Sequence, residues 1–311
     1  MLRPRAALLS LLSCTWLLLP ACAGSQAGSP ADAEEPAPQW AQGKAADAAS
    51  LFQTDYADEL SADDTSFLTA VASYYLAPGE EVAVAPIEDE WAWAPSETPV
   101  VRFALDEAGS TVVVTRGEES QEVSARTTIE DKVDIMPVSY VLSPQDTRWR
   151  VLIHEHHTEA RDDFVQFEWF PVDTRFIAEG RFVPASERTP TPLQTSRGEA
   201  KTLYLAGQIE FELRGQACVL QAFAYTAEAV VEEELLVPFK DDTTGKQTYG
   251  AGRYLELRAP DLQYSDFIEL DFNRATNPYC AYSEHYNCPF PPSFNTLELA
   301  VEAGVLAPSD H

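Results

Sequence analysis

Residues 238–292 read PFKDDTTGKQTYGAGRYLELRAPDLQYSDFIELDFNRATNPYCAYSEHYNCPFPP. Short apolar runs at 254–257 and 267–272 alternate here with turns rich in Gly, Pro, Asn and Asp. That alternation is typical of an antiparallel β domain. The stretch also holds more Arg, Asp, Asn, Tyr and Cys than a plain β core needs, so it is the first place to search for a site.

The same pattern extends over most of the chain, with turn residues at intervals typical of sandwiches and barrels. We expect strands at 100–105, 111–115, 138–142, 149–154, 164–170, 176–183, 209–213, 219–224, 234–239, 254–257, 267–272 and 297–301. No strand–helix alternation indicates a parallel α/β sheet. The sequence predicts a mainly β protein of two abutting antiparallel units, sandwich- or barrel-like, at residues 51–160 and 161–308. One continuous β assembly is the alternative.

A short helical segment is expected before the first β unit. Apolar residues recur at three-to-four spacing over 51–60 and again over 67–75. Leu76-Ala77-Pro78-Gly79 then supplies a proline and glycine stop.

The first 21 residues indicate export. Arg3 and Arg5 precede an apolar run, Ala6–Leu19, that is too short to span a membrane but fits a signal peptide. Leu19-Pro20-Ala21-Cys22 resembles the lipobox of bacterial lipoproteins, which places lipidation at Cys22 and the membrane among the partners. By resemblance to Gram-negative sorting, the Ala that follows indicates the outer membrane. Ordinary secretion is the alternative, because Ala21-Cys22-Ala23 also fits a signal-peptidase site.

Residues 22–50 are small, polar and rich in proline, without apolar periodicity. This composition predicts a disordered tether between the lipid anchor and the folded domain.

The chain is strongly acidic, with a net charge of −29. Removal of the signal, which carries two Arg and no acid, brings the mature chain to −31 (−29 − 2). Such a charge repels phosphate backbones, so nucleic acid is excluded as a partner. Solubility is the simpler account of the acidity.

Three cysteines remain after the signal and Cys22 are set aside. Cys280 and Cys288 lie in one Pro-rich loop, and an exported chain permits disulfides, so we expect them to be bonded. Cys218 lies in an apolar run and is expected as a small buried hydrophobe. A metal site that combines Cys280, Cys288 and His285 is the weaker alternative, because its spacing matches no common zinc pattern.

Polar residues of the quoted stretch form a candidate ligand pocket. Period-2 alternation places Glu269, Asp271 and Asn273 on one face of the 267–272 strand. These oxygens could bind Ca²⁺ or hold Arg253 or Arg274 in ion pairs, and we favour the ion pairs. Tyr249, Arg253, Glu269, Asp271, Asn273 and Arg274 are the six candidates.

The other motifs are weaker evidence for a functional site. His154 and His156 are weak metal candidates, since they would share a strand face but lack a third ligand. Thr243-Thr244-Gly245-Lys246 lacks the first glycine of a phosphate loop and is better explained as a turn. The chain contains no G-x-S-x-G and no H-E-x-x-H. We expect no metal and no cofactor.

From residue 164 to 306 the chain resembles an uncharacterised bacterial and archaeal family, domain of unknown function 1684. The resemblance rests on ordered sequence blocks at 169–173, 178–184, 237–241, 243–255, 270–275, 277–278, 280–282, 288–292, 295 and 300–304. Thr276 and Tyr279 depart from it, where Tyr and Pro are usual. Residues 67–84 resemble the family's N-terminal extension, which in relatives is similar to a forkhead-associated-type β-sandwich. The resemblance implies a fold and a domain boundary, but no reaction.

Two functions compete. The favoured one is a non-catalytic cell-envelope lipoprotein whose β domain binds a small ligand or an envelope protein. The alternative is an envelope hydrolase or metal-dependent enzyme with a site around Arg253, Asp271 and Asn273, helped by Tyr249, because these residue types gather in two segments.

Lipidation gives the first testable prediction. Intact-mass analysis of the mature protein should show a chain that begins at Cys22 and carries fatty acyl groups, and Cys22→Ala should abolish that added mass. An unlipidated chain that begins at Gly24 would contradict the prediction.

Overall fold

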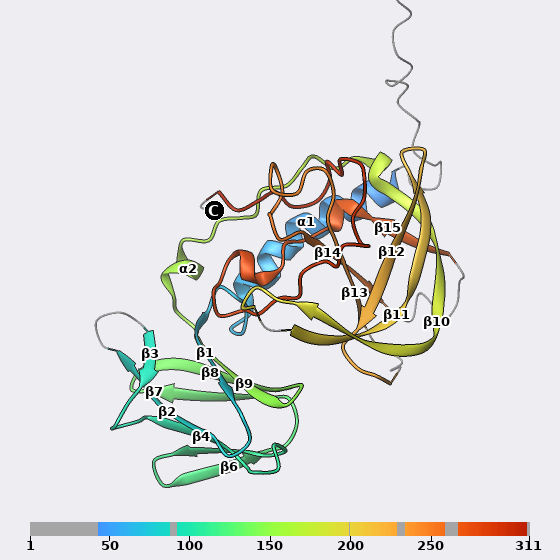
Figure 1. Ribbon diagram of the computed structural model, residues 1–311. Helices are drawn as coiled ribbons and strands as arrows, with labels where there is room; N and C mark the ends of the chain where they lie inside the picture. Colours follow the sequence, from blue (N-terminus) through green and yellow to red (C-terminus); the bar gives the residue numbers. More distant parts are fainter. Residues whose placement is uncertain (1–42, 88–91, 199, 229–233, 259–266, 310–311) are drawn as a thin grey trace, which may run out of the picture. The chain divides into compact units, whose positions relative to one another are not determined.

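The protein is described here from a computed structural model, which covers residues 43–87, 92–198, 200–228, 234–258 and 267–309 (Figure 1). The predicted signal peptide, Cys22 and most of the tether lie outside the described residues. Fifteen strands form three antiparallel sheets, which confirms the mainly β fold. No helix in the described part of the chain is long and apolar enough to cross a membrane.

The first β unit is a sandwich of two sheets. Its nine strands are β1 (Ala70–Leu76), β2 (Glu81–Ile87), β3 (Ala92–Pro95), β4 (Val101–Leu105), β5 (Val112–Arg116), β6 (Glu119–Val123), β7 (Thr127–Val133), β8 (Met136–Gln145) and β9 (Arg148–Glu155). One sheet has the order β1-β9-β8-β7 and the other β3-β2-β4-β5-β6. Apolar side chains of both sheets share one core, which defines the sandwich.

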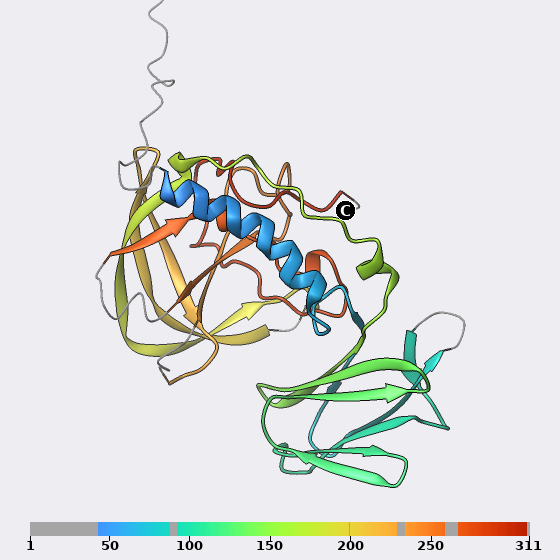
Figure 2. The same cartoon turned by 180° about the vertical axis from the view of Figure 1, so that it is seen from behind.

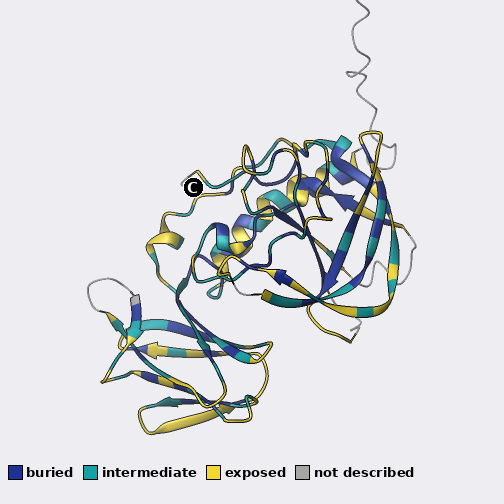
Figure 3. Ribbon diagram, in the orientation of Figure 1, coloured by how far each residue is buried: buried dark blue, intermediate teal, exposed yellow. Residues whose placement is uncertain are grey.

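Strand β4 shows why these residues form a half-buried sheet. Val101, Phe103 and Leu105 are buried, whereas Arg102 between them is exposed and pairs with Glu81 on β2 at 2.7 Å. Figure 3 shows the same alternation of buried and exposed residues along other strands. A sheet with one apolar face must bury that face against another layer, and here the layer is the second sheet.

The second β unit is a six-stranded sheet that curls into a half-barrel (Figure 1). Its strands are β10 (Ile177–Gln194), β11 (Ala200–Leu213), β12 (Gln216–Ala224), β13 (Glu234–Phe239), β14 (Arg253–Arg258) and β15 (Phe267–Asp271), in the order β14-β13-β12-β11-β10-β15. The long pair β10–β11 slips register between Pro184 and Thr189. At Gly207, beside this bulge, a Cβ would lie 2.6 Å from both the Phe182 ring and the Val183 carbonyl oxygen, so only glycine fits.

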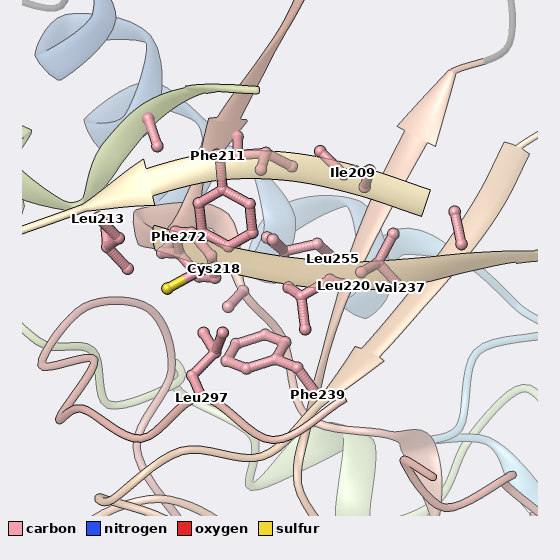
Figure 4. Close-up of a cluster of buried hydrophobic side chains, with 14 of the residues drawn as sticks. Ile209, Phe211, Leu213, Cys218, Leu220, Val237, Phe239, Leu255, Phe272 and Leu297 are labelled. Atoms are coloured by element: carbon pink, nitrogen blue, oxygen red, sulfur yellow. The ribbon is translucent and has the colours of Figure 1, made fainter. Parts of the chain in front are cut away.

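The concave side of this sheet holds the main core of the second unit. Phe211, Leu220, Val237 and Phe239 from its strands point toward one another in Figure 4. Leu297, from the C-terminal segment that follows the last strand, completes the packing. Cys218 is also buried there, 6% exposed, as the sequence predicts.

Helix α1 (Lys44–Ala62) lies along the half-barrel (Figure 2). Its Gln53 Nε2 donates a hydrogen bond of 3.0 Å to the carbonyl oxygen of Asn273, and the Arg274 guanidinium lies 4.6 Å from the centre of the Phe52 ring. The helix begins at Lys44, so the prediction of a disordered tether is wrong for residues 44–50. Alanine has the highest helix propensity, and Ala45 and Ala49 are buried, so this end of the segment folds.

The structure corrects three further elements. Residues 67–75 are not helical: most of them belong to β1, whose partner β9 overrides the apparent helical spacing. Residues 164–170 and 297–301 are not strands, although isolated bridges pair Trp169 with Val305 and Lys240 with Thr296. Their alternation reflects extended backbone packed on the core.

Short connecting elements are α2 (Glu159–Asp162), η3 (Thr174–Phe176), η4 (Phe272–Arg274) and η5 (Tyr279–Ala281).

The sandwich buries a titratable side chain at the end of β9. His154 is fully buried, and its Nδ1 lies 3.0 Å from Thr69 Oγ1. No hydrogen-bond partner for its Nε2 is present among the described residues. Burial, with a smaller contribution from Arg150, lowers the pKa of His154 from 6.5 to about 4.

The buried imidazole predicts acid sensitivity. Between pH 6.5 and 4 the unfolded chain binds a proton at His154 that the folded chain refuses, so stability is lost as the pH falls through that window. The loss should reach about 3 kcal/mol by pH 4. Chemical denaturation at pH 7 and pH 4 should show a smaller pH-dependent loss in His154→Gln. The exposed His157→Gln is the control, and an equal loss in all three proteins would contradict the assignment.

Candidate functional site

The half-barrel is not closed, because β14 and β15 form the two edges of its sheet. A cavity of about 540 Å³ adjoins this seam. Side chains from α1, β14, β15, η4 and the segment 276–289 line it. Its volume lies within the range of small-molecule sites, roughly 300–1,000 Å³.

One wall of the cavity is the outer face of β13 and β14. Tyr254, Glu256 and Arg258 are two residues apart on β14 and therefore share that face, while the intervening Leu255 faces the core. The antiparallel register places Glu234 of β13 directly opposite Arg258. Beyond β13, the Lys201 Nζ lies 5.4 Å from the centre of the Tyr225 ring.

The facing wall is aromatic and acidic. Helix α1 contributes Phe52, Tyr56 and Glu59, and the C-terminal segment contributes Tyr279 and Tyr286. Tyr279 and Tyr286 meet edge to face, with ring centres 5.3 Å apart. The aromatic side chains give the cavity apolar surfaces between its charges.

Of the carboxylates that line this cavity, Asp271 is buried, whereas Glu256 and Glu269 are exposed. Burial raises the pKa of Glu256, and the neighbouring Glu234 raises it further. Burial also raises the pKa of Glu269 and of Asp271, with Arg274 acting in the opposite direction on both. Carboxylates with raised pKa values are common at functional sites.

Three predicted site residues line the cavity: Glu269, Asp271 and Arg274. Strand β15 ends at Asp271, so Asn273 does not share its face as predicted but lies in η4. Asn273 is fully buried; its Oδ1 accepts from the Asp173 amide at 2.8 Å and its Nδ2 donates to the Asp173 carbonyl at 3.0 Å. It thereby ties η4 to the segment before β10.

Arg253 lies in a different network. It is 1% exposed, and its guanidinium donates to the carbonyl oxygens of Val301 (2.9 Å) and Ala303 and pairs with Asp241 at 3.4 Å. Burial lowers the pKa of Arg253 to about 10, with Asp241 opposing the shift. The structure therefore does not bring Arg253 together with Asp271 and Asn273.

Asp241 also organises the turn that superficially resembles a phosphate loop. Its carboxylate accepts hydrogen bonds from Thr243 Oγ1 at 2.8 Å, Thr244 Oγ1 at 3.0 Å and the Val301 amide at 2.8 Å. The turn is thus a structural one, in agreement with the sequence analysis. Tyr249, which follows it, donates to the carbonyl oxygen of Cys280 at 3.5 Å.

The predicted disulfide is not present. Cys280 and Cys288 are free thiols, and the Cys280 amide donates to Cys288 Sγ at 3.3 Å. A hydrogen bond with Cys288 lowers the pKa of Cys280 to about 7, and the same contact, with burial, raises that of Cys288. Closeness in sequence brings the two residues together, but bonding also requires a particular Cβ and sulfur geometry that spacing does not set.

The histidine cluster lies apart from the cavity. His154 contacts Thr69, whereas His156 Nε2 lies 2.7 Å from Ser139 Oγ and its Nδ1 lies 3.4 Å from Asp64. No group of three or more His, Cys, Asp or Glu side chains in the described ranges could hold a metal ion. Cys280, Cys288 and His285 therefore form no such group either.

The cavity includes residues that the sequence analysis did not single out, above all Lys201, Tyr225, Glu234, Tyr254 and Glu256. They come from three strands, β11, β13 and β14, and from Tyr225 directly after β12, and they meet only because of the register between these strands. One sequence signal was available: Glu256 interrupts the apolar run Tyr254–Leu257. The alternation rule alone would have placed it on the solvent side.

The geometry defines the C-terminal part of the chain as an open half-barrel with a small-molecule-sized cavity beside its seam. Residues 162–305 match the model of a family described as "Protein of unknown function (DUF1684)". Through these residues the chain belongs to that family, as its sequence blocks indicate.

A solution NMR structure of an uncharacterised protein from Haloarcula marismortui is also similar. The two sequences are 38% identical over a match that covers 50% of this chain and 83% of that chain, with a TM-score of 0.41. No curated protein matches the chain.

The Arg253 network predicts a structural role for that residue. Arg253→Ala removes the cation and leaves the buried Asp241 without its charge partner, which should lower the free energy of unfolding by about 3–5 kcal/mol. Arg181→Ala is the matched control, because the exposed Arg181–Glu210 pair at 3.7 Å should contribute less than about 1 kcal/mol. Urea unfolding measures both. Equal effects of the two substitutions would contradict the structural assignment.

Proposed function

We propose that the protein is a cell-envelope lipoprotein whose half-barrel domain binds a small ligand in the cavity beside the β14–β15 seam. Its location rests on the sequence of residues 1–22: a basic start, a short apolar run and the lipobox-like Leu19–Cys22. Several acyl chains at Cys22 would anchor it stably, with the outer membrane as the proposed site.

One observation carries the binding role: the cavity combines concave shape, aromatic walls and carboxylates with raised pKa values. The volume of the cavity falls within the range of small-molecule sites, although its lining holds more charged groups than is usual for them. Glu269, Asp271 and Arg274, selected from the sequence as ligand-pocket residues, line this same cavity.

A non-catalytic role is the simpler proposal for this site. The residues of the enzymatic alternative are occupied elsewhere, since Arg253 holds Asp241 and the C-terminal backbone while Asn273 joins η4 to Asp173. Neither residue is among those that line the cavity. Recognition of a ligand requires only the charges and rings that do line it.

A substitution that narrows the cavity tests the proposal. Thr276 lines the cavity, so Thr276→Tyr should fill part of it, whereas Thr189→Tyr adds the same bulk at an exposed position on β10. A thermal-shift screen would use amines, amino acids, monosaccharides and short carboxylates. A ligand at 100 times its Kd stabilises the native state by about 2.7 kcal/mol, which corresponds to a Tm rise of several degrees.

At least one class should raise the Tm of the wild type and of Thr189→Tyr but leave that of Thr276→Tyr unchanged. Equal shifts in all three proteins, or no shift with any class, would overturn binding in this cavity.

A further inference from the structure

Glu256 lies among tyrosines. It lines the same cavity as Tyr56, Tyr225 and Tyr279, and its charge contributes to raising the pKa of each phenol. Tyr225 and Tyr279 are 51% and 37% exposed, which leaves ring surface open toward the cavity that they line. The three rings come from α1, the end of β12 and η5, three parts of the sequence that only the fold brings together.

Glu256 has no cationic partner in the described part of the chain. It forms no ion pair there, and the causes that shift its pKa are burial and the like charge of Glu234, with no opposing basic group. The side chain is exposed to the cavity although protein surrounds it. An unpaired carboxylate at the wall of a cavity attracts a positive group of a ligand.

The basic residues of the cavity have other neighbours. Arg258 lies opposite Glu234 in the β13–β14 register, Arg274 lies over the Phe52 ring, and Lys201 lies over the Tyr225 ring. Burial lowers the pKa of Lys201. The lining as a whole has six carboxylates (Glu59, Asp63, Glu234, Glu256, Glu269 and Asp271) against four basic side chains.

Asp271 provides an independent indication of a ligand. It is 7% exposed, and its Oδ1 caps η4 by accepting from the Asn273 amide at 3.0 Å and from Asn273 Nδ2 at 2.9 Å. Its Oδ2 receives no hydrogen bond from any described residue, although Asp271 lines the cavity. A nine-tenths-buried carboxylate therefore presents an open acceptor at this second position.

We propose that the cavity selects an organic cation, with an ammonium group held against the Glu256 carboxylate between the rings of Tyr56, Tyr225 and Tyr279. This inference rests on the binding role proposed above and specifies its ligand class. A cation over the face of an aromatic ring is attracted by the ring quadrupole, and quaternary ammonium groups are recognised by such aromatic cages. A carboxylate in the cage attracts a cation, but it gives no such attraction to an anion or a neutral sugar.

Choline and 3,3-dimethylbutan-1-ol form a matched pair of probes, because they have the same shape and differ in the positive charge. Calorimetry would measure their binding to the purified full-length protein, with putrescine as a second cation and glucose as a neutral polar probe. We expect choline or putrescine to bind at least tenfold more tightly than either neutral probe.

Two variants test the cage itself. Glu256→Gln should weaken cation binding about tenfold, since a factor of ten corresponds to 1.4 kcal/mol, and Tyr225→Leu should weaken it roughly three- to tenfold. Both should leave any binding of the neutral probes unchanged. Glu119→Gln, at an exposed position on β6, is the control and should bind as the wild type does. Circular dichroism melting of each variant verifies folding.

Three results would overturn the inference: equal binding of choline and its neutral isostere, binding of glucose with neither cation, or cation binding that Glu256→Gln leaves intact. In the first two cases, if Thr276→Tyr weakens binding of the neutral probe, the cavity is still the binding site. Only the proposed ligand class is then wrong. Absence of binding by all four probes also overturns the cationic class. The broader screen with Thr276→Tyr then decides the binding function separately.

Discussion

The buried ion pair between Arg253 and Asp241 connects the C-terminal segment to the sheet of the second β unit. The guanidinium is 1% exposed, and its two terminal nitrogens donate to Asp241 and to the carbonyl oxygens of Val301 and Ala303, whereas its Nε has no hydrogen-bond partner among the described residues. Asp241 in turn accepts from the Val301 amide. The pair thus attaches a C-terminal segment without strands to the concave side of the sheet, where Leu297 and Val301 complete the core.

The same contact has a consequence for the cavity. Arg253 is the first residue of β14, and once its side chain is fixed on the core side, alternation sends Tyr254 and Glu256 to the opposite face. The backbone pairing of Tyr254 with Thr276 then holds the C-terminal segment beside that face. A structural ion pair on one side of a strand therefore positions the candidate binding residues on the other.

The cavity exists because the sheet stops short of closure. A closed barrel would pair β14 with β15 and leave no seam, whereas here each is an edge strand. Helix α1 lies along the half-barrel and contributes Phe52 and Tyr56 to the lining. Covering an edge with a helix is a common way to protect it, and in this protein the cover also forms a wall of the site.

The alternation of apolar and polar residues predicted burial correctly where a strand packs one face on a core. Ile268 and Leu270 alternate with Glu269 and are buried as the sequence predicts, and Cys218 lies in the core. The residue pattern gave a wrong prediction where strand pairing determines the structure: residues 67–75 have helical spacing, but most of them form a strand that pairs with β9. It also failed at Cys280 and Cys288, whose side-chain geometry spacing does not determine.

By itself, the sequence determined the mainly β class and the family, because these follow from local periodicity and contiguous motifs. It also named Glu269, Asp271 and Arg274 as candidates, and these three line the cavity. Only the tertiary structure separated Arg253 and Asn273 into structural networks and placed Glu256 among three tyrosines. Those contacts join residues that are distant along the chain. Their meeting is set by sheet register, strand ends and helix docking, which no local spacing encodes.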